Sequence, residues 1–170
     1  CLRSDLTLRD CVLSDNFAAG DGGGMLIDAS PSPQIVNCQF ESNAANGSGG
    51  GIAIINGSSP SISDSSFISN DAAWGGAISA RSNCAPTMSG CTFASNSAIY
   101  SAGALDANEN CSPTLNNCAF LGNQAGYWAG AVSVGAGGIG AFQDCLFVLN
   151  SAADTGGGLV GVGSTLTVAD

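Results

Sequence analysis

Four aromatic side chains stand at related places in the sequence and could form a binding surface: Trp74, Tyr100, Tyr127 and Trp128. Flat rings in a row can stack on sugar faces or anchor a protein partner, because Trp and Tyr combine a large rigid apolar area with one polar atom. The same rings could instead only cover the loops that carry them and the neighbouring chain. The sequence therefore indicates a candidate ligand or partner surface.

Charged residues that could do catalysis are few. Arg81 could approach Asp106 and Glu109, but a solvated salt bridge is the usual meaning of such a trio. A glycosidase needs two carboxyl groups about 5 to 10 Å apart, and a lyase needs carboxylates for calcium beside a basic residue. The chain has no His and no Lys, so general bases are scarce. We predict no catalytic residue and no cofactor, with a polysaccharide-degrading enzyme as the alternative.

The eight cysteines favour an oxidising compartment. Cys84 and Cys111 share an N-C-x-P context 27 residues apart, and stacking them about 5 Å apart predicts a disulfide. The remaining cysteines of the repeats are expected to pack as small buried hydrophobes, because a single file gives neither bridging distances nor a tetrahedral metal site. They are Cys11, Cys38, Cys91, Cys118 and Cys145.

Three Asn-x-Ser sequons, at Asn46, Asn56 and Asn110, predict N-glycosylation if the chain is secreted. The alternative is ordinary turn chemistry, which uses the same residue types.

A repeat of 26 or 27 residues must position all of these side chains. Six copies begin at Cys11, Cys38, Ser65, Cys91, Cys118 and Cys145. A fixed period of this size indicates stacked units that bury a core only against their neighbours. We expect residues 1–170 to form one solenoid segment, with 1–10 ending a preceding circuit and 11–170 forming six repeats. The missing polar caps and initiator Met predict a longer parent chain.

Each copy has the same internal order. Its first and third positions are apolar, which predicts a short strand with one buried face. A small pair and an aliphatic residue, such as Gly103-Ala104-Leu105, predict a second strand, and a third follows Pro in most copies. The sixth position is always Asn, which we interpret as a left-handed corner and as a ladder of stacked amides. The ladder comprises Asn16, Asn43, Asn70, Asn96, Asn123 and Asn150.

The predicted fold is an all-β, right-handed parallel β-helix with about six circuits and three short strands per circuit. Helical solenoids have longer repeats and need better helix formers than Gly, Ser and Asn. A left-handed triangular coil would have a repeat of about 18 residues and equal sides, in contrast to these unequal strands.

The motifs FESN, FISN, FASN, FLGN and FVLN, together with GGAI at residues 75–78, resemble the F-x-x-N and G-G-A-[ILV] motifs of polymorphic outer membrane protein repeats and autotransporter passengers. The resemblance covers residues 11–170. It departs at LSDN in the first copy and at the second motif in five copies. It implies a surface-exposed or secreted protein in adhesive or structural roles, and it brings no catalytic residues.

Composition narrows the function further. The formal charge of −10, with only Arg3, Arg9 and Arg81 as cations, disfavours nucleic acid and anionic membranes as partners. No apolar run approaches the 20 or so residues of a membrane-spanning helix. Thr is too scattered for an ice-binding ladder. We therefore predict an extracellular or cell-surface spacer, adhesin or filament unit, whose partners are its own copies, matrix components or glycans. The alternative is a carbohydrate-binding or polysaccharide-degrading domain.

Overall fold

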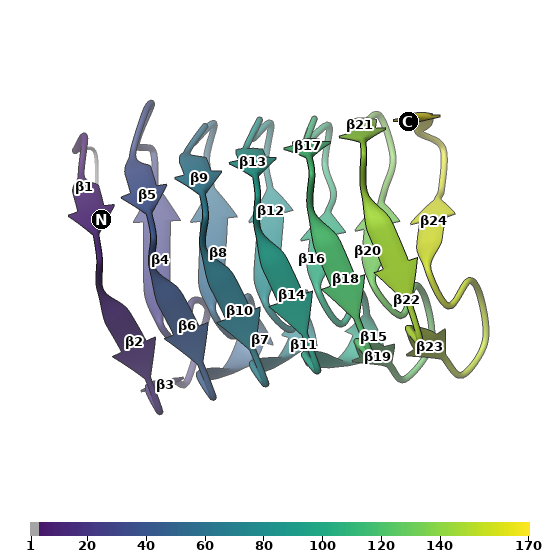
Figure 1. The fold of residues 1–170 in the computed structure, drawn as a ribbon, viewed down its shortest axis with the longest axis horizontal. Coiled ribbons are helices and arrows are strands. Elements are labelled where there is room, and N and C mark those ends of the chain that lie inside the picture. Colours follow the sequence, from purple (N-terminus) through teal and green to yellow (C-terminus); the bar gives the residue numbers. More distant parts are fainter. Residues whose placement is uncertain (1–3) are drawn as a thin grey trace.

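The computed structural model describes residues 4–170, which wind into a parallel β-solenoid (Figure 1). Strands of successive circuits pair in parallel and in register, so that Phe67 lies between Phe40 and Phe93. The described residues contain 25 strands and no helix. The predicted all-β solenoid of about six circuits is confirmed.

Four parallel sheets run along the solenoid. The Phe sheet carries the inward Phe residues and comprises β2 (Val12–Ser14), β6 (Gln39–Glu41), β10 (Ser66–Ile68), β14 (Thr92–Ala94), β18 (Ala119–Leu121) and β22 (Leu146–Val148). The corner sheet follows the Asn column and comprises β3 (Phe17–Ala18), β7 (Ala44–Ser48), β11 (Asp71–Trp74), β15 (Ser97–Ser101), β19 (Gln124–Ala125) and β23 (Ser151–Ala152).

The other two sheets complete each circuit. The groove sheet follows the small pair and comprises β4 (Met25–Asp28), β8 (Ile52–Ile55), β12 (Ile78–Arg81), β16 (Leu105–Ala107), β20 (Val132–Val134) and β24 (Leu159–Gly161). The seven-stranded sheet comprises β1 (Thr7–Arg9), β5 (Gln34–Val36), β9 (Ser61–Ser63), β13 (Thr87–Ser89), β17 (Thr114–Asn116), β21 (Ile139–Gln143) and β25 (Thr165–Ala169).

The corner sheet adds a fourth strand to each circuit, whereas the sequence predicted three. The sequence predicts a loop after each Asn, but these residues are extended, and Asp71 and Ala72 pair with Ser97 and Ala98 of the next circuit. Pairing satisfies backbone N–H and C=O groups that a loop would leave to water. This extra strand fixes the direction of the side chains at its end, including Trp74.

The core is made of stacked identical residues. Neighbouring rings of the Phe column have centroids 4.7 to 5.0 Å apart and lie almost parallel. The column comprises Phe40, Phe67, Phe93, Phe120 and Phe147. The facing aliphatic residues of the groove sheet, such as Ile78 and Leu105, are fully buried. The ring separation matches the spacing of paired strands, so one ring fits each circuit.

The left-handed corner lies one residue earlier than the sequence predicted. Ser42, Ser69 and Ser95, at the fifth position, have φ between 53° and 55°, whereas the Asn residues that follow them are not left-handed. The Asn side chains point inward and form a continuous ladder: the Nδ2 of each donates to the Oδ1 of the next at 2.9 to 3.0 Å. The ladder therefore seals the corner, while the preceding residue makes the turn.

Candidate functional site

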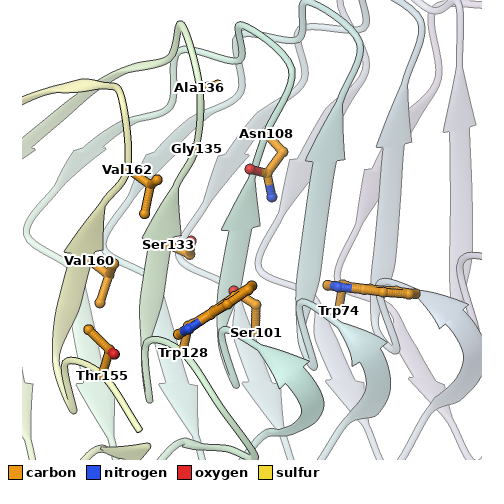
Figure 2. A pocket seen from close by; sticks show the side chains of 10 residues that line it. All are labelled: Trp74, Ser101, Asn108, Trp128, Ser133, Gly135, Ala136, Thr155, Val160 and Val162. Atoms are coloured by element: carbon orange, nitrogen blue, oxygen red, sulfur yellow. The ribbon is translucent and has the colours of Figure 1, made fainter.

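A groove runs along the outer face of the groove sheet. Inward residues such as Ile78 and Ala80 alternate with outward ones, and the outward column of paired residues forms the floor. Its members are Ala53, Ser79, Asp106, Ser133 and Val160. Figure 2 shows Trp74 and Trp128 along one side of this floor and Asn108 and Ala136 along the other. The alternation of the strand thus supplies the floor, and the flanking turns supply the walls.

Two adjoining cavities occupy the groove. The first, of about 390 Å³, lies around Trp74, Ser101, Trp128 and Ser133 (Figure 2). The second, of about 420 Å³, lies around Arg81, Asp106 and Glu109. Both are bounded by Trp74, Asn108 and Ala136. The shared walls make them two parts of one elongated site.

The structure brings the four predicted aromatic residues together. They line a common hollow of about 390 Å³, and each is 40% to 53% exposed. The ring of Tyr100 lies 4.8 Å from Trp74 and 6.1 Å from Tyr127, measured between centroids. Trp74 and Trp128 belong to one column of paired residues with Ser101 between them. The two indoles therefore face the groove, and the tyrosines lie behind them on the corner.

Asp106 lies at the floor of the groove and is almost completely buried, with 4% of its surface exposed. Ser101 Oγ donates to one carboxylate oxygen at 3.0 Å and Asn108 Nδ2 to the other at 2.7 Å. Burial raises the pKa of this carboxyl to about 6, although the hydrogen bonds and the nearby Arg81 charge oppose the rise. Asp106 is thus a carboxyl group that is held in a fixed position and loses its proton near pH 6.

Arg81 does not make the ion pair that the sequence suggested. It lines the same cavity as Asp106 and Glu109, but its guanidinium pairs with Asp21, two circuits earlier. The pair is supported by Ser48, whose hydroxyl accepts from Arg81 Nη1 at 3.2 Å and whose backbone N–H donates to Asp21 at 2.8 Å. The long side chain runs back along the axis because the column of Asp21 and Ser48 offers these acceptors. Arg81 therefore forms an ion pair with Asp21 that links circuits of the solenoid.

The predicted Cys84–Cys111 disulfide is not formed in the structure, where both residues are buried free thiols. The Cys111 sulfur accepts a hydrogen bond from the backbone N–H of Cys84 at 3.1 Å. A hydrogen bond between the two thiols lowers the pKa of Cys84 below its ordinary value. In-register stacking spaces equivalent atoms by about 4.8 Å, which is wider than the Cβ separation of a disulfide.

The predicted column of cysteines also consists of free thiols that donate to backbone carbonyls two residues earlier, as Cys38 does to Val36 at 3.2 Å. Ser65 replaces Cys in this column and makes the same bond to Ser63 at 2.7 Å. Cys1 lies outside the described residues. Within residues 4–170 there is no group of three or more metal-ligating side chains.

The three sequon asparagines are exposed: Asn46 lies within β7, Asn56 at a turn and Asn110 at a bend. Asn56 and Asn110 have left-handed backbones, and Asn56 donates to Asp28 at 2.7 Å. The sequon hydroxyls of Ser48 and Ser58 are buried and hydrogen-bonded. Glycosylation of Asn46, Asn56 and Asn110 stays a prediction.

The sequence did not single out the polar residues of the groove, Ser101, Ser133 and Asn108. For Ser133 the signal was present in the alternation of the second strand, where every outward residue must line the same face. Ser101 ends the corner strand β15 and Asn108 follows β16, so this alternation does not include them. The flanking walls of the groove could not be found in this way, because they depend on the path of the turns.

Comparison with known proteins supports the fold. A family whose description is right handed beta helix region matches residues 3–170. No curated protein and no solved structure gave a match. The resemblance to polymorphic outer membrane and autotransporter repeats stays a prediction. Across the described residues no helix has the length and apolar character needed to cross a membrane.

Proposed function

We propose, from the premise that the chain belongs to the right-handed β-helix family, that it is a non-catalytic adhesive module of the cell surface or extracellular space whose groove binds carbohydrate. The family includes both non-enzymatic and polysaccharide-degrading proteins, so the choice depends on the site itself.

The observation that carries this proposal is the pair of exposed indoles, Trp74 and Trp128, beside a cavity whose polar lining groups are uncharged. A sugar ring has an apolar face of C–H groups and a rim of hydroxyls. The face can stack on an indole, and the rim can exchange hydrogen bonds with Ser101, Ser133 and Asn108. A cavity of about 390 Å³ lies in the usual range for small-molecule sites.

The solenoid favours binding by holding these groups in fixed positions. The Asn ladder and in-register strands tie each circuit to its neighbours. Among the described residues, every buried side-chain N or O atom has a hydrogen-bond partner. A rigid site loses little conformational entropy when its ligand binds, and this stiffness also suits a spacer.

The same groove argues for binding without catalysis. Both oxygens of Asp106 already accept hydrogen bonds from the protein, and Arg81 is paired with Asp21.

Polysaccharide cleavage is the second candidate, favoured by the raised pKa of Asp106 and by Glu109 in the same cavity. A carboxyl of pKa about 6 could donate a proton to a leaving oxygen.

A glycan array, followed by calorimetry on the glycans it identifies, tests the proposal. Trp74→Ala and Trp128→Ala should each weaken binding about tenfold or more. Ile99→Ala, at a 56% exposed residue of the same edge, should leave it unchanged. Wild-type affinity in both Trp variants, or no glycan binding at all, would refute the proposal. Release of new reducing ends from a bound glycan, abolished in Asp106→Asn, would establish the degradative alternative.

A further inference from the structure

The two indoles of the groove lie two circuits apart in one column, and this spacing bears on which carbohydrate the groove could bind. The inference rests on the proposed carbohydrate-binding role. We propose that it holds an extended, uncharged, β-linked hexose chain parallel to the solenoid axis, with Trp74 and Trp128 stacked on sugar rings two residues apart.

The first argument is the distance between the indoles along the axis. Trp74 pairs with Ser101, and Ser101 pairs with Trp128, so the two indoles are two circuits apart in one column. Paired strands lie about 4.8 Å apart, which puts the two attachment points about 9.6 Å apart. This is close to the length of one disaccharide in an extended β-(1→4)-linked hexose chain. Each sugar therefore spans about one circuit.

The second argument is the orientation of the sugar rings. In an extended two-fold chain each ring is turned over relative to the last, so rings i and i+2 present the same face. Two indoles with one residue between them match this alternation. The intervening position is Ser101, which leaves room for ring i+1. An α-(1→4)-linked glucose chain curves, and its rings leave the straight line that the in-register circuits define (Figure 1).

The third argument is charge. The cavity between the indoles is lined only by uncharged residues, whose polar groups come from Ser101, Ser133, Asn108 and Thr155 (Figure 2). The adjoining cavity adds Asp106 and Glu109, and Arg81 there is already paired. Carboxylates of a polyuronate would be repelled at this end of the groove. The net charge of −10 acts in the same direction.

The packing behind Trp74 supports its use as a fixed platform. Tyr100 lies against it with ring centroids 4.8 Å apart, and Tyr127 follows at 6.1 Å. This stack restricts the rotation of the indole, so the platform is positioned before a ligand arrives.

Isothermal titration calorimetry on the 170-residue chain tests the inference with three sets of oligosaccharides: β-(1→4)-glucose, α-(1→4)-glucose and α-(1→4)-galacturonate oligomers. Affinity for the β-linked set should rise with length up to about three rings, the number that spans two circuits. The other two sets should bind at least about tenfold more weakly, a difference of about 1.4 kcal/mol.

An exchange variant separates spacing from the mere presence of aromatic rings. Trp128→Thr combined with Thr155→Trp keeps two indoles but moves one to the next circuit, three circuits from Trp74. Thr155 is exposed, so the exchange should preserve the fold, which circular dichroism checks. We expect it to lose affinity for the β-linked set as fully as Trp128→Ala does.

The outcomes distinguish the inference about the β-linked chain from the proposed carbohydrate-binding function. Wild-type affinity in the exchange variant, equal binding of α-linked glucose, or preference for galacturonate would overturn the inference. Carbohydrate binding that depends on Trp74 would in each case keep the proposed function. If no oligosaccharide binds, the inference and the proposed function fail together.

Discussion

Replacement of Asn96 by Ala should remove a fully bonded link from the middle of the Asn ladder. This side chain is completely buried. Its Oδ1 accepts from the backbone N–H and the Nδ2 of Asn70, both at 2.9 Å. Its Nδ2 donates to the Phe67 carbonyl at 3.0 Å and to Asn123 Oδ1 at 2.9 Å.

The cost follows from the groups that lose their partners. Truncation of Asn96 leaves two buried donors on Asn70 without an acceptor. Each buried unsatisfied group costs about 1 to 3 kcal/mol, so we expect a loss of about 2 to 6 kcal/mol in the free energy of unfolding. A domain with the usual stability of about 5 to 15 kcal/mol would lose a large part of it.

Asn16→Ala is the matched control, at the exposed end of the same ladder. Its Nδ2 donates to Asn43 Oδ1, which also accepts the Asn16 backbone N–H and so keeps a partner after truncation. We expect a cost of about 0.5 kcal/mol. Urea unfolding followed by circular dichroism measures both variants. Equal costs for Asn16→Ala and Asn96→Ala would refute the view that the buried ladder stabilises the corner.

Three further predictions test the backbone and the groove. Gly103→Ala should strongly lower the melting temperature, because the added Cβ would lie 2.5 Å from the Gln124 carbonyl oxygen. Gly158→Ala should be neutral or stabilising by up to about 1 kcal/mol, because its Cβ would meet nothing nearer than 4.0 Å. Similar changes in the two variants would contradict this steric explanation. Leu149 is 87% exposed with φ of 56°, so Leu149→Asn should stabilise by about 1 kcal/mol in urea melts, and a loss would show that the turn is not strained. The folded-state pKa of Asp106, about 6, lies above its ordinary 3.8, so ionisation should weaken the fold by about 3 kcal/mol as pH rises from about 4 to 6. Asp106→Asn should abolish that loss, and unfolding profiles of the same shape in both proteins would exclude it.

The sequence predicted the fold because identical residues recur once per circuit. Phe at the third position and Asn at the sixth must each form a column once strands pair in register. The same regularity hid the corner sheet, since residues such as Ser97 and Ala98 have no strong strand preference. They become a strand because their neighbours in the adjacent circuits offer partners, which is a tertiary effect.

The site was only partly predictable, because parts of it also depend on tertiary contacts between circuits. The aromatic residues could be found, since they interrupt a run of small residues. Their separation into a groove wall and a corner stack depends on a register shift between Ala72 and Trp74, which no local pattern signals. The pairing of Arg81 with Asp21 was missed because it skips a circuit, whereas sequence reasoning compared adjacent repeats.

The exposure of the indoles is difficult to explain by stability alone. The Phe column and the Asn ladder already close the core of the circuits that carry Trp74 and Trp128. Aromatic residues that served only as a cover would be expected to lie against that core and to be buried, as the Phe residues are. Trp74 and Trp128 instead leave 40% and 52% of their surfaces to water and flank a serine. Large apolar surface left exposed beside a groove is a usual mark of a binding site. The gap at Ser101 therefore matters as much as the indoles, because a continuous aromatic column would close the space that a ligand ring needs.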